Sequence, residues 1–164
     1  THCLSSAASD VYKRQFNYKE TKPFMIALNE MNYNFKDWKQ FEDHDFLLHF
    51  IEKGKILESY QSSLVNIACK CHKIIVHKIN NEFYKVAYVN TNLFKNEIAN
   101  KLVLETNCDF SITYNYDDAK NLTKFSLRSI DEKTDVGYIA KIIGGGGHRN
   151  AAGFTKSGIH KQII

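Results

Sequence analysis

Four consecutive glycines, residues 144–147, constrain the fold of this 164-residue chain more than any other feature. Glycine takes positive φ values readily, and because it has no Cβ a ligand can approach its main chain closely. The preceding stretch, 135–143, has helical spacing that puts four apolar side chains on one face: Val136, Ile139, Ala140 and Ile143. The glycines are therefore expected to end a helix and to open a loop.

His148 and Arg149 follow the glycines directly. Exposed backbone N–H groups in such a loop suit a phosphate or a carboxylate, and the imidazole and guanidinium groups would add donors beside them. The alternative is a helix C-cap with a flexible turn, but one glycine suffices for a cap. The run lacks the Lys-Ser or Lys-Thr of a P-loop and the Gly-x-Gly-x-x-Gly spacing of a dinucleotide-binding turn.

Arg128 belongs to an expected strand, 124–130. Alternation along a strand puts Phe125, Leu127 and Ser129 on one face, whereas Lys124, Ser126, Arg128 and Ile130 share the other. A guanidinium among small polar neighbours suits a phosphate, because its donors form a planar fork. The alternative interpretation is a surface arginine paired with Asp131 or Glu132.

These segments together resemble a known family. Three segments carry the resemblance: the strand with Ser-Leu-Arg-Ser ending at Ser129, the helix at 135–143, and the glycine run followed by His-Arg-Asn-Ala-Ala-Gly-Phe up to Phe154. Together they resemble the C-terminal, DHH-associated domain of DHH phosphoesterases of the RecJ and oligoribonuclease types. The resemblance covers most of residues 16–158. It implies that Arg128 and His148 contact the phosphate or nucleobase of a substrate.

The full set of expected phosphate-binding residues is Arg128, Gly144, Gly145, Gly146, Gly147, His148, Arg149 and Asn150. Lys124 is a secondary candidate, and Tyr138 is a candidate for stacking on a base. No catalytic, metal or cofactor residue is expected in this chain.

The resemblance also implies what the whole protein does. The family's N-terminal catalytic domain has no counterpart here, so the chain is expected to be a fragment that is inactive alone. That domain would hold two divalent metal ions, usually manganese, which activate water against phosphodiester or phosphomonoester bonds. Expected partners are that missing domain and single-stranded nucleic acid, short oligonucleotides or nucleotides. The alternative is a non-catalytic RNA-binding module similar to the C-terminal domain of alanyl-tRNA synthetases.

Four segments are expected along the chain. Residues 1–15 resemble a translated adaptor sequence and are interpreted as an artefactual tag. Residues 16–71 form a linker region with a long helix from Asp45 to about Cys71, which Asp43 or Asp45 caps. The DHH-associated domain spans 72–158, and 159–164 form a C-terminal tail.

The composition fits a cytoplasmic globular protein without a membrane span. Hydrophobic residues make up 43% and charged residues 24% of the chain, whose formal net charge is +4. This mild excess permits a polyanionic partner. Cys69 and Cys71 are too close in sequence for the usual zinc pairing, so reduced thiols are expected. The Asp43-His44-Asp45 run is interpreted as helix capping and not as metal ligation.

The expected fold is α/β, a small mixed sheet with flanking helices after the long linker helix. Asn80 and Asn81 would turn a hairpin between strands 73–79 and 83–89. Asn92 would cap a helix at 93–105, with Leu93, Ile98 and Leu102 facing inward. Strands are further expected at 110–116, 124–130 and 152–155.

Overall fold

A computed structural model describes residues 19–31 and 34–163 of the chain. The expected tag at 1–15 lies outside the described residues. The chain divides between Ser63 and Leu64 into two compact units. Among the described residues, no helix combines the length and apolar character that a membrane crossing requires.

The first unit is helical and packs around phenylalanine rings. It contains α2 (Thr21–Leu28), α3 (Phe35–Trp38), the 3-10 turn η1 (Lys39–Glu42) and the beginning of the long helix α4 (His44–Lys70). The rings of Phe24, Phe41 and Phe50 meet edge to face, with centroids 4.9–5.6 Å apart. Such pairs add specific geometry to the burial of apolar area.

Asp43 caps α4, as expected. Its Oδ1 accepts hydrogen bonds from the backbone N–H groups of Asp45 (2.9 Å) and Phe46 (3.2 Å). The carboxylate therefore satisfies donors that a helix N-terminus leaves without intrahelical partners. The capping interpretation of the Asp43-His44-Asp45 run is confirmed.

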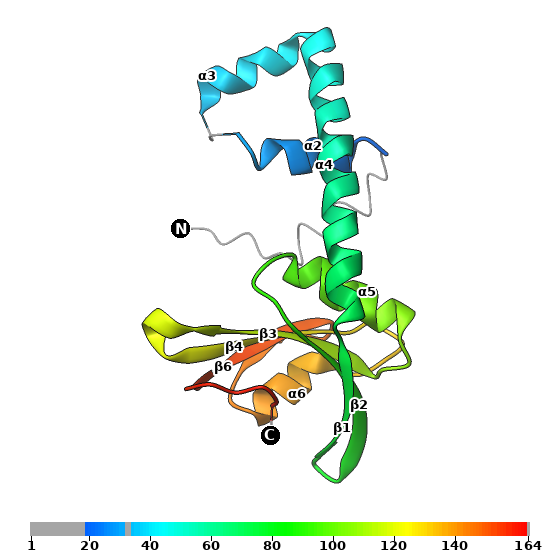
Figure 1. The fold of residues 1–164 in the computed structure, drawn as a ribbon, viewed down its shortest axis with the longest axis vertical. Helices are drawn as coiled ribbons and strands as arrows, with labels where there is room; N and C mark the ends of the chain where they lie inside the picture. Colours follow the sequence, from blue (N-terminus) through cyan, green and yellow to red (C-terminus); the bar gives the residue numbers. More distant parts are fainter. Residues whose placement is uncertain (1–18, 32–33, 164) are drawn as a thin grey trace. The chain divides into compact units, whose positions relative to one another are not determined.

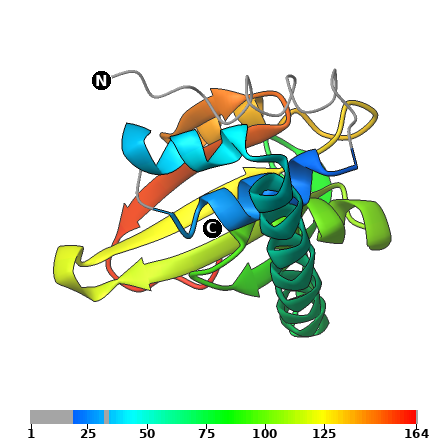
Figure 2. The same cartoon turned by 90° about the horizontal axis from the view of Figure 1, so that it is seen from above.

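Gly54 allows α2 to pass close to α4 (Figure 1, Figure 2). A Cβ at this position would lie 2.0 Å from the carbonyl oxygen of Pro23. Glycine in a helix interior usually weakens the helix slightly. In the structure its missing side chain is what permits the contact between the two helices.

The second unit is built on a six-stranded mixed sheet in the order β1-β2-β3-β4-β6-β5. The strands are β1 (Lys73–Ile79), β2 (Glu82–Asn90), β3 (Phe110–Asp117), β4 (Leu122–Arg128), β5 (Gly146–His148) and β6 (Ala151–Ser157). The neighbours β2 and β3 run parallel, whereas the other four pairs are antiparallel. The expected α/β class with a mixed sheet and a preceding long helix is confirmed.

Two helices cover opposite faces of this sheet (Figure 1). Helix α6 (Val136–Ile142) packs on the face that carries the larger core, which includes Phe110, Ile112, Phe125, Leu127 and Phe154. Helix α5 (Lys95–Glu105) packs on the other face, against Ala87 and Val89 of β2. Ile163, after β6, is also buried in the α6-side core.

Local expectations were met at the hairpin and missed at the start of α5. Asn80 and Asn81 have φ values of 47° and 69°, as the hairpin turn between β1 and β2 requires. Helix α5 begins at Lys95 without a side-chain cap, so Asn92 is not its cap. Ile98 and Leu102 face inward as expected, but Leu93 precedes the helix and is 64% exposed.

Candidate anion-binding site

The glycine run ends a helix, as expected, but does not form an open loop. Gly144 has φ +91°, and the N–H of Gly145 donates to the carbonyl of Ala140 at 2.8 Å, which closes α6. The rest of the run then pairs with β6 as the edge strand β5. The expected open loop is therefore wrong for Gly146 and Gly147, which lie in a strand. The binding of a phosphate by the four glycines stays a prediction.

Close packing of β5 on β6 explains why glycine is needed there. A Cβ on Gly147 would lie 2.4 Å from the Cα of Ala152, and one on Gly145 would lie 2.3 Å from the carbonyl oxygen of Gly153. Gly146 is different, because a Cβ at that position would meet nothing within 4 Å. Two of the glycines thus serve packing, and Gly146 adjoins open space.

Arg128 and His148 lie opposite the same residue. Ala151 of β6 pairs with Arg128 of β4 on one side and with His148 of β5 on the other. Residues directly opposite each other on paired strands project from the same face of a sheet. The guanidinium and the imidazole therefore lie on one face, and Ala151 of β6 is the residue between them. The structure therefore brings together the two residues that the sequence singled out.

This face of β4, β6 and β5 is called the polar face below. Phe125 and Leu127 of β4 are buried in the core on the α6 side, whereas Lys124, Ser126 and Arg128 are half-buried on the other side. The pairing of residues across β4, β6 and β5 shows which residues make up this face: Lys124, Ser126, Arg128, Gly146, His148, Ala151, Gly153 and Thr155. Small residues fill its centre, and cationic or imidazole groups stand at its ends.

Hydrogen bonds hold the guanidinium of Arg128. Its Nη1 donates to the carbonyl of Leu127 at 2.8 Å, and its Nη2 donates to the Oδ1 of Asn96 on α5. A side chain fixed in this way loses less conformational entropy when it binds a ligand.

Arg149 and Asn150 make contacts that fix the turn between β5 and β6. Arg149 Nη2 donates to the carbonyls of Asp131 (2.8 Å) and Lys133 (3.1 Å), and its Nη1 lies 3.9 Å from Asp135 Oδ2. Asn150 Nδ2 donates to Asp131 Oδ1. These contacts give both residues a structural role, and their expected phosphate contacts stay a prediction.

Sequence reasoning missed two residues of α5 that border the polar face. Lys95 Nζ donates to Asn115 Oδ1 of β3, and Asn96 accepts the hydrogen bond from Arg128. Burial, and then the positive charge of Lys124, lower the pKa of Lys95. Lys124 itself pairs with Asp117 at 2.7 Å. The helical spacing of 95–105 indicates a helix, but it does not show which strand the first turn meets.

Tyr138 is not brought to the polar face, which removes it as a stacking partner there. It lies on α6, on the opposite face of the sheet, and its hydroxyl accepts a 3.3 Å hydrogen bond from Asn80 Nδ2. It lines an acidic pocket of about 440 Å³ whose lining is Glu82, Tyr84, Asp109, Glu132, Lys133, Thr134, Asp135 and Tyr138.

The histidines and cysteines between α4 and β2 make ordinary structural contacts. His72 Nδ1 lies 2.7 Å from the carbonyl of Cys69, and His77 Nε2 lies 2.9 Å from the hydroxyl of Tyr88. Within residues 19–31 and 34–163, no group of three or more His, Cys, Asp or Glu side chains is placed to hold a metal ion.

No protein-family model matches the chain. Over 145 residues it is 31% identical to an uncharacterized protein of Acanthamoeba polyphaga mimivirus; the match covers 88% of this chain and 34% of that protein. The chain thus spans 34% of the length of this relative.

Several solved structures resemble the chain, and two of them have named activities or relationships. An exopolyphosphatase-related protein from Bacteroides fragilis matches 80% of this chain and 41% of its own, with a TM-score of 0.47 and 18% identity. A pGpG-specific phosphodiesterase from Vibrio cholerae matches 92% of this chain and 61% of its own, with a TM-score of 0.54 and 15% identity. The second match shows that the chain shares the fold of that phosphodiesterase.

Proposed function

We propose that this chain is the substrate-binding part of a DHH-type phosphoesterase and that it binds phosphate groups of nucleotides or short oligonucleotides on the polar face. The observation that carries the proposal is the placement of Arg128 and His148 opposite the same alanine. The sequence resemblance and the fold shared with a pGpG-specific phosphodiesterase support it.

The chemistry of the two side chains suits a phosphate. The guanidinium offers a fork of charged donors that matches phosphate oxygens, and it is held in place by Asn96. The exposed imidazole of His148 adds a donor from the neighbouring strand. Ala151 lies between them, and Gly146 lies two residues before His148 on β5. Neither carries a long side chain that would cover the main chain.

Hydrolysis itself is assigned to another part of the protein. Under this proposal the divalent metal ions, usually manganese, would be held by the family's N-terminal catalytic domain. The role proposed for this chain is to bind and orient the phosphate-bearing substrate.

A binding experiment tests the proposal. The 164-residue chain is titrated with 5′-phosphorylated diadenylate (pApA) in a calorimeter, as wild type, as Arg128→Ala and as Arg128→Lys. The alanine variant should lose on the order of 1.5–3 kcal/mol of binding free energy, as expected for a charged hydrogen bond. Lysine should restore part of this loss, since a point charge cannot reproduce the fork.

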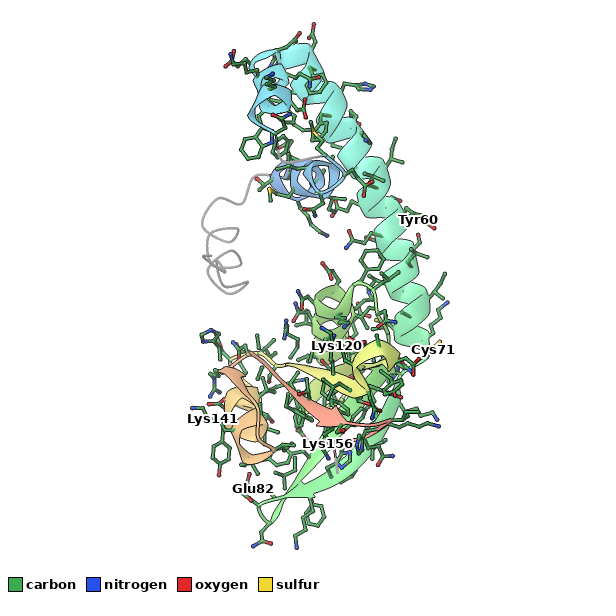
Figure 3. The ribbon with its side chains drawn as sticks, turned by 90° about the vertical axis from the view of Figure 1, so that its left-hand side faces the viewer. Tyr60, Cys71, Glu82, Lys120, Lys141 and Lys156 are labelled. Carbon is green, nitrogen blue, oxygen red and sulfur yellow. The ribbon has the colours of Figure 1, made fainter. Side chains whose placement is uncertain are left out.

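Lys141→Ala is the matched control. This exposed lysine lies on α6, on the opposite face of the sheet (Figure 3), and its removal lowers the net charge by the same amount. Its affinity for pApA should equal that of the wild type. Equal losses in Lys141→Ala and Arg128→Ala would indicate a general charge effect and would overturn the proposed site.

A further inference from the structure

Helix α5 begins beside the polar face without a side-chain cap. Its N-cap position is Phe94, an apolar residue with φ 50°, and no side chain accepts a hydrogen bond there. The first N–H groups of a helix have no intrahelical partners and carry a partial positive charge, which favours an anion. Glu97 is the one acidic residue of this first turn.

Three contacts place this helix start over the sheet. Lys95 contacts Asn115, Asn96 contacts Arg128, and the carbonyl of Ala99 accepts a 2.7 Å hydrogen bond from Ser111 Oγ. Ser111 and Asn115 lie on β3, next to β4. The first turn of α5 therefore runs along β3 at the border of the polar face.

A buried hydroxyl lies on β3 between the two residues whose side chains contact α5. Thr113 stands between Ser111 and Asn115 on the same face of β3, opposite Ser126 of β4. It is 0% exposed, and its Oγ1 has no hydrogen-bond partner within the described chain. Because a buried hydroxyl is nearly always hydrogen-bonded, this one marks a place where an additional polar atom is expected.

Two lysines lie at the end of the polar face that Lys124 occupies. Lys95 donates a hydrogen bond to Asn115, which pairs with Lys124 across the β3–β4 ladder. Burial, and then the positive charge of Lys124, lower the pKa of Lys95. The facing charged groups are Asp117, which pairs with Lys124, and Glu97 on α5. An anion between two ammonium groups relieves their repulsion.

We propose that Lys95, Lys124 and the first turn of α5 form a second phosphate subsite, so that the polar face takes at least two phosphate groups of one oligonucleotide. The proposal rests on the proposed function, in which Arg128 and His148 hold the first phosphate. Lys124 and Arg128 are four residues apart on β4, about 13 Å at the rise of a strand. A chain of linked phosphates can span this distance, whereas a mononucleotide phosphate occupies one subsite at a time.

The test compares a ligand with one phosphate and a ligand with several. Fluorescence-detected competition measures the affinities of 5′-AMP and of 5′-phosphorylated triadenylate (pApApA) for the 164-residue chain. Lys95→Met and Lys124→Met should each lower the affinity for pApApA roughly tenfold. The affinity of each variant for 5′-AMP should stay within about twofold of the wild-type value. The logarithm of the binding constant for pApApA falls linearly with the logarithm of the salt concentration. Each substitution should reduce the magnitude of this slope by about 0.7, because one fewer lysine neutralises a phosphate of the ligand.

Two further variants separate the subsite from general effects. Lys141→Met removes an exposed lysine from α6, on the opposite face of the sheet (Figure 3), and should change neither affinity. Asp117→Asn removes the carboxylate that competes for Lys124 and should strengthen pApApA several-fold. A gain in affinity cannot arise from a damaged fold.

The outcomes are distinct for the two proposals. Equal losses for 5′-AMP and pApApA in the lysine variants, or no loss for either, would overturn the second subsite. An Arg128→Ala variant that keeps full affinity for 5′-AMP would overturn the proposed function instead. If the lysine variants bind only pApApA more weakly, and Arg128→Ala binds both pApApA and 5′-AMP more weakly, the second subsite and the proposed function are both established.

Discussion

Asn96 accepts a hydrogen bond from Nη2 of Arg128 and so connects the first turn of α5 to the fourth strand. This contact orients the guanidinium, whose Nη1 is bound to the carbonyl of Leu127. Asn96 is therefore a positioning residue for Arg128 in the proposed site.

Replacement of Asn96 by Ala should weaken the binding of pApA, because Arg128 then has to be ordered by the ligand itself. The expected loss is about 0.5–1.5 kcal/mol of binding free energy, less than the loss in Arg128→Ala. In the Arg128→Ala background the Asn96 substitution should have no further effect on affinity. Calorimetry of the two single variants and the double variant checks this; independent, additive losses would contradict the positioning role.

Gly146 and Gly147 should respond in opposite ways to substitution. Gly146→Val should keep the wild-type melting temperature, since a Cβ there meets nothing within 4 Å, but it should weaken phosphate binding because the side chain projects from the polar face. Gly147→Ala should lower the melting temperature for two reasons. Alanine rarely adopts a φ of +144°, and the added Cβ would lie 2.4 Å from the Cα of Ala152. Thermal unfolding together with binding of pApA separates the two effects. A Gly146→Val variant with full affinity would remove β5 from the site.

Gly54→Ala should destabilise the helical unit. The new Cβ would lie 2.0 Å from the carbonyl oxygen of Pro23, so α2 has to move away from α4. Overpacking of this kind costs about 1–3 kcal/mol. Ser62→Ala, an exposed position on the same helix, is the control and should leave stability nearly unchanged. Hydrogen exchange of α2 in both variants reports the effect, and unchanged protection in Gly54→Ala would refute the close packing.

His77 should make the sheet unit sensitive to acid. Burial lowers the pKa of His77 below its ordinary value of 6.5. The unfolded chain therefore takes up a proton near pH 6.5 while the folded chain does not, so stability is complete above that range and is lost as the pH falls. His77→Gln should reduce the loss of unfolding free energy between pH 7.5 and pH 5.

The exposed His49 provides the control for this titration. His49→Gln should leave the pH dependence of urea unfolding as in the wild type. If His77→Gln and the wild type lose the same free energy between the two pH values, the buried imidazole is not the group responsible.

Much of the fold could be predicted from local patterns. The apolar spacing of 135–143 predicted α6 because the helix buries one face, and Asn80-Asn81 predicted the hairpin because both residues accept positive φ. The alternation around Arg128 correctly placed Phe125 and Leu127 on the opposite face of the strand, which is the buried one. These features depend on residues that are neighbours in the sequence.

The shape of the glycine segment and the role of α5 could not be predicted in the same way. The pairing of β5 with β6 depends on how closely two strands approach, and glycine permits both that approach and an open loop. The contacts of Lys95 with Asn115 and of Asn96 with Arg128 join residues 20 and 32 positions apart. Only the tertiary arrangement of α5 on the sheet brings them together.

Arg128 and His148 are proposed to bind the same phosphate, and a double-mutant cycle with 5′-AMP tests this most directly. Calorimetry gives the affinities of the wild type, Arg128→Ala, His148→Ala and the double variant, with melting temperatures to verify folding. If one phosphate bridges the two side chains, the single losses should be non-additive, with a coupling free energy of about 0.5–3 kcal/mol. Strictly additive losses, or full affinity in either folded single variant, would contradict the claim.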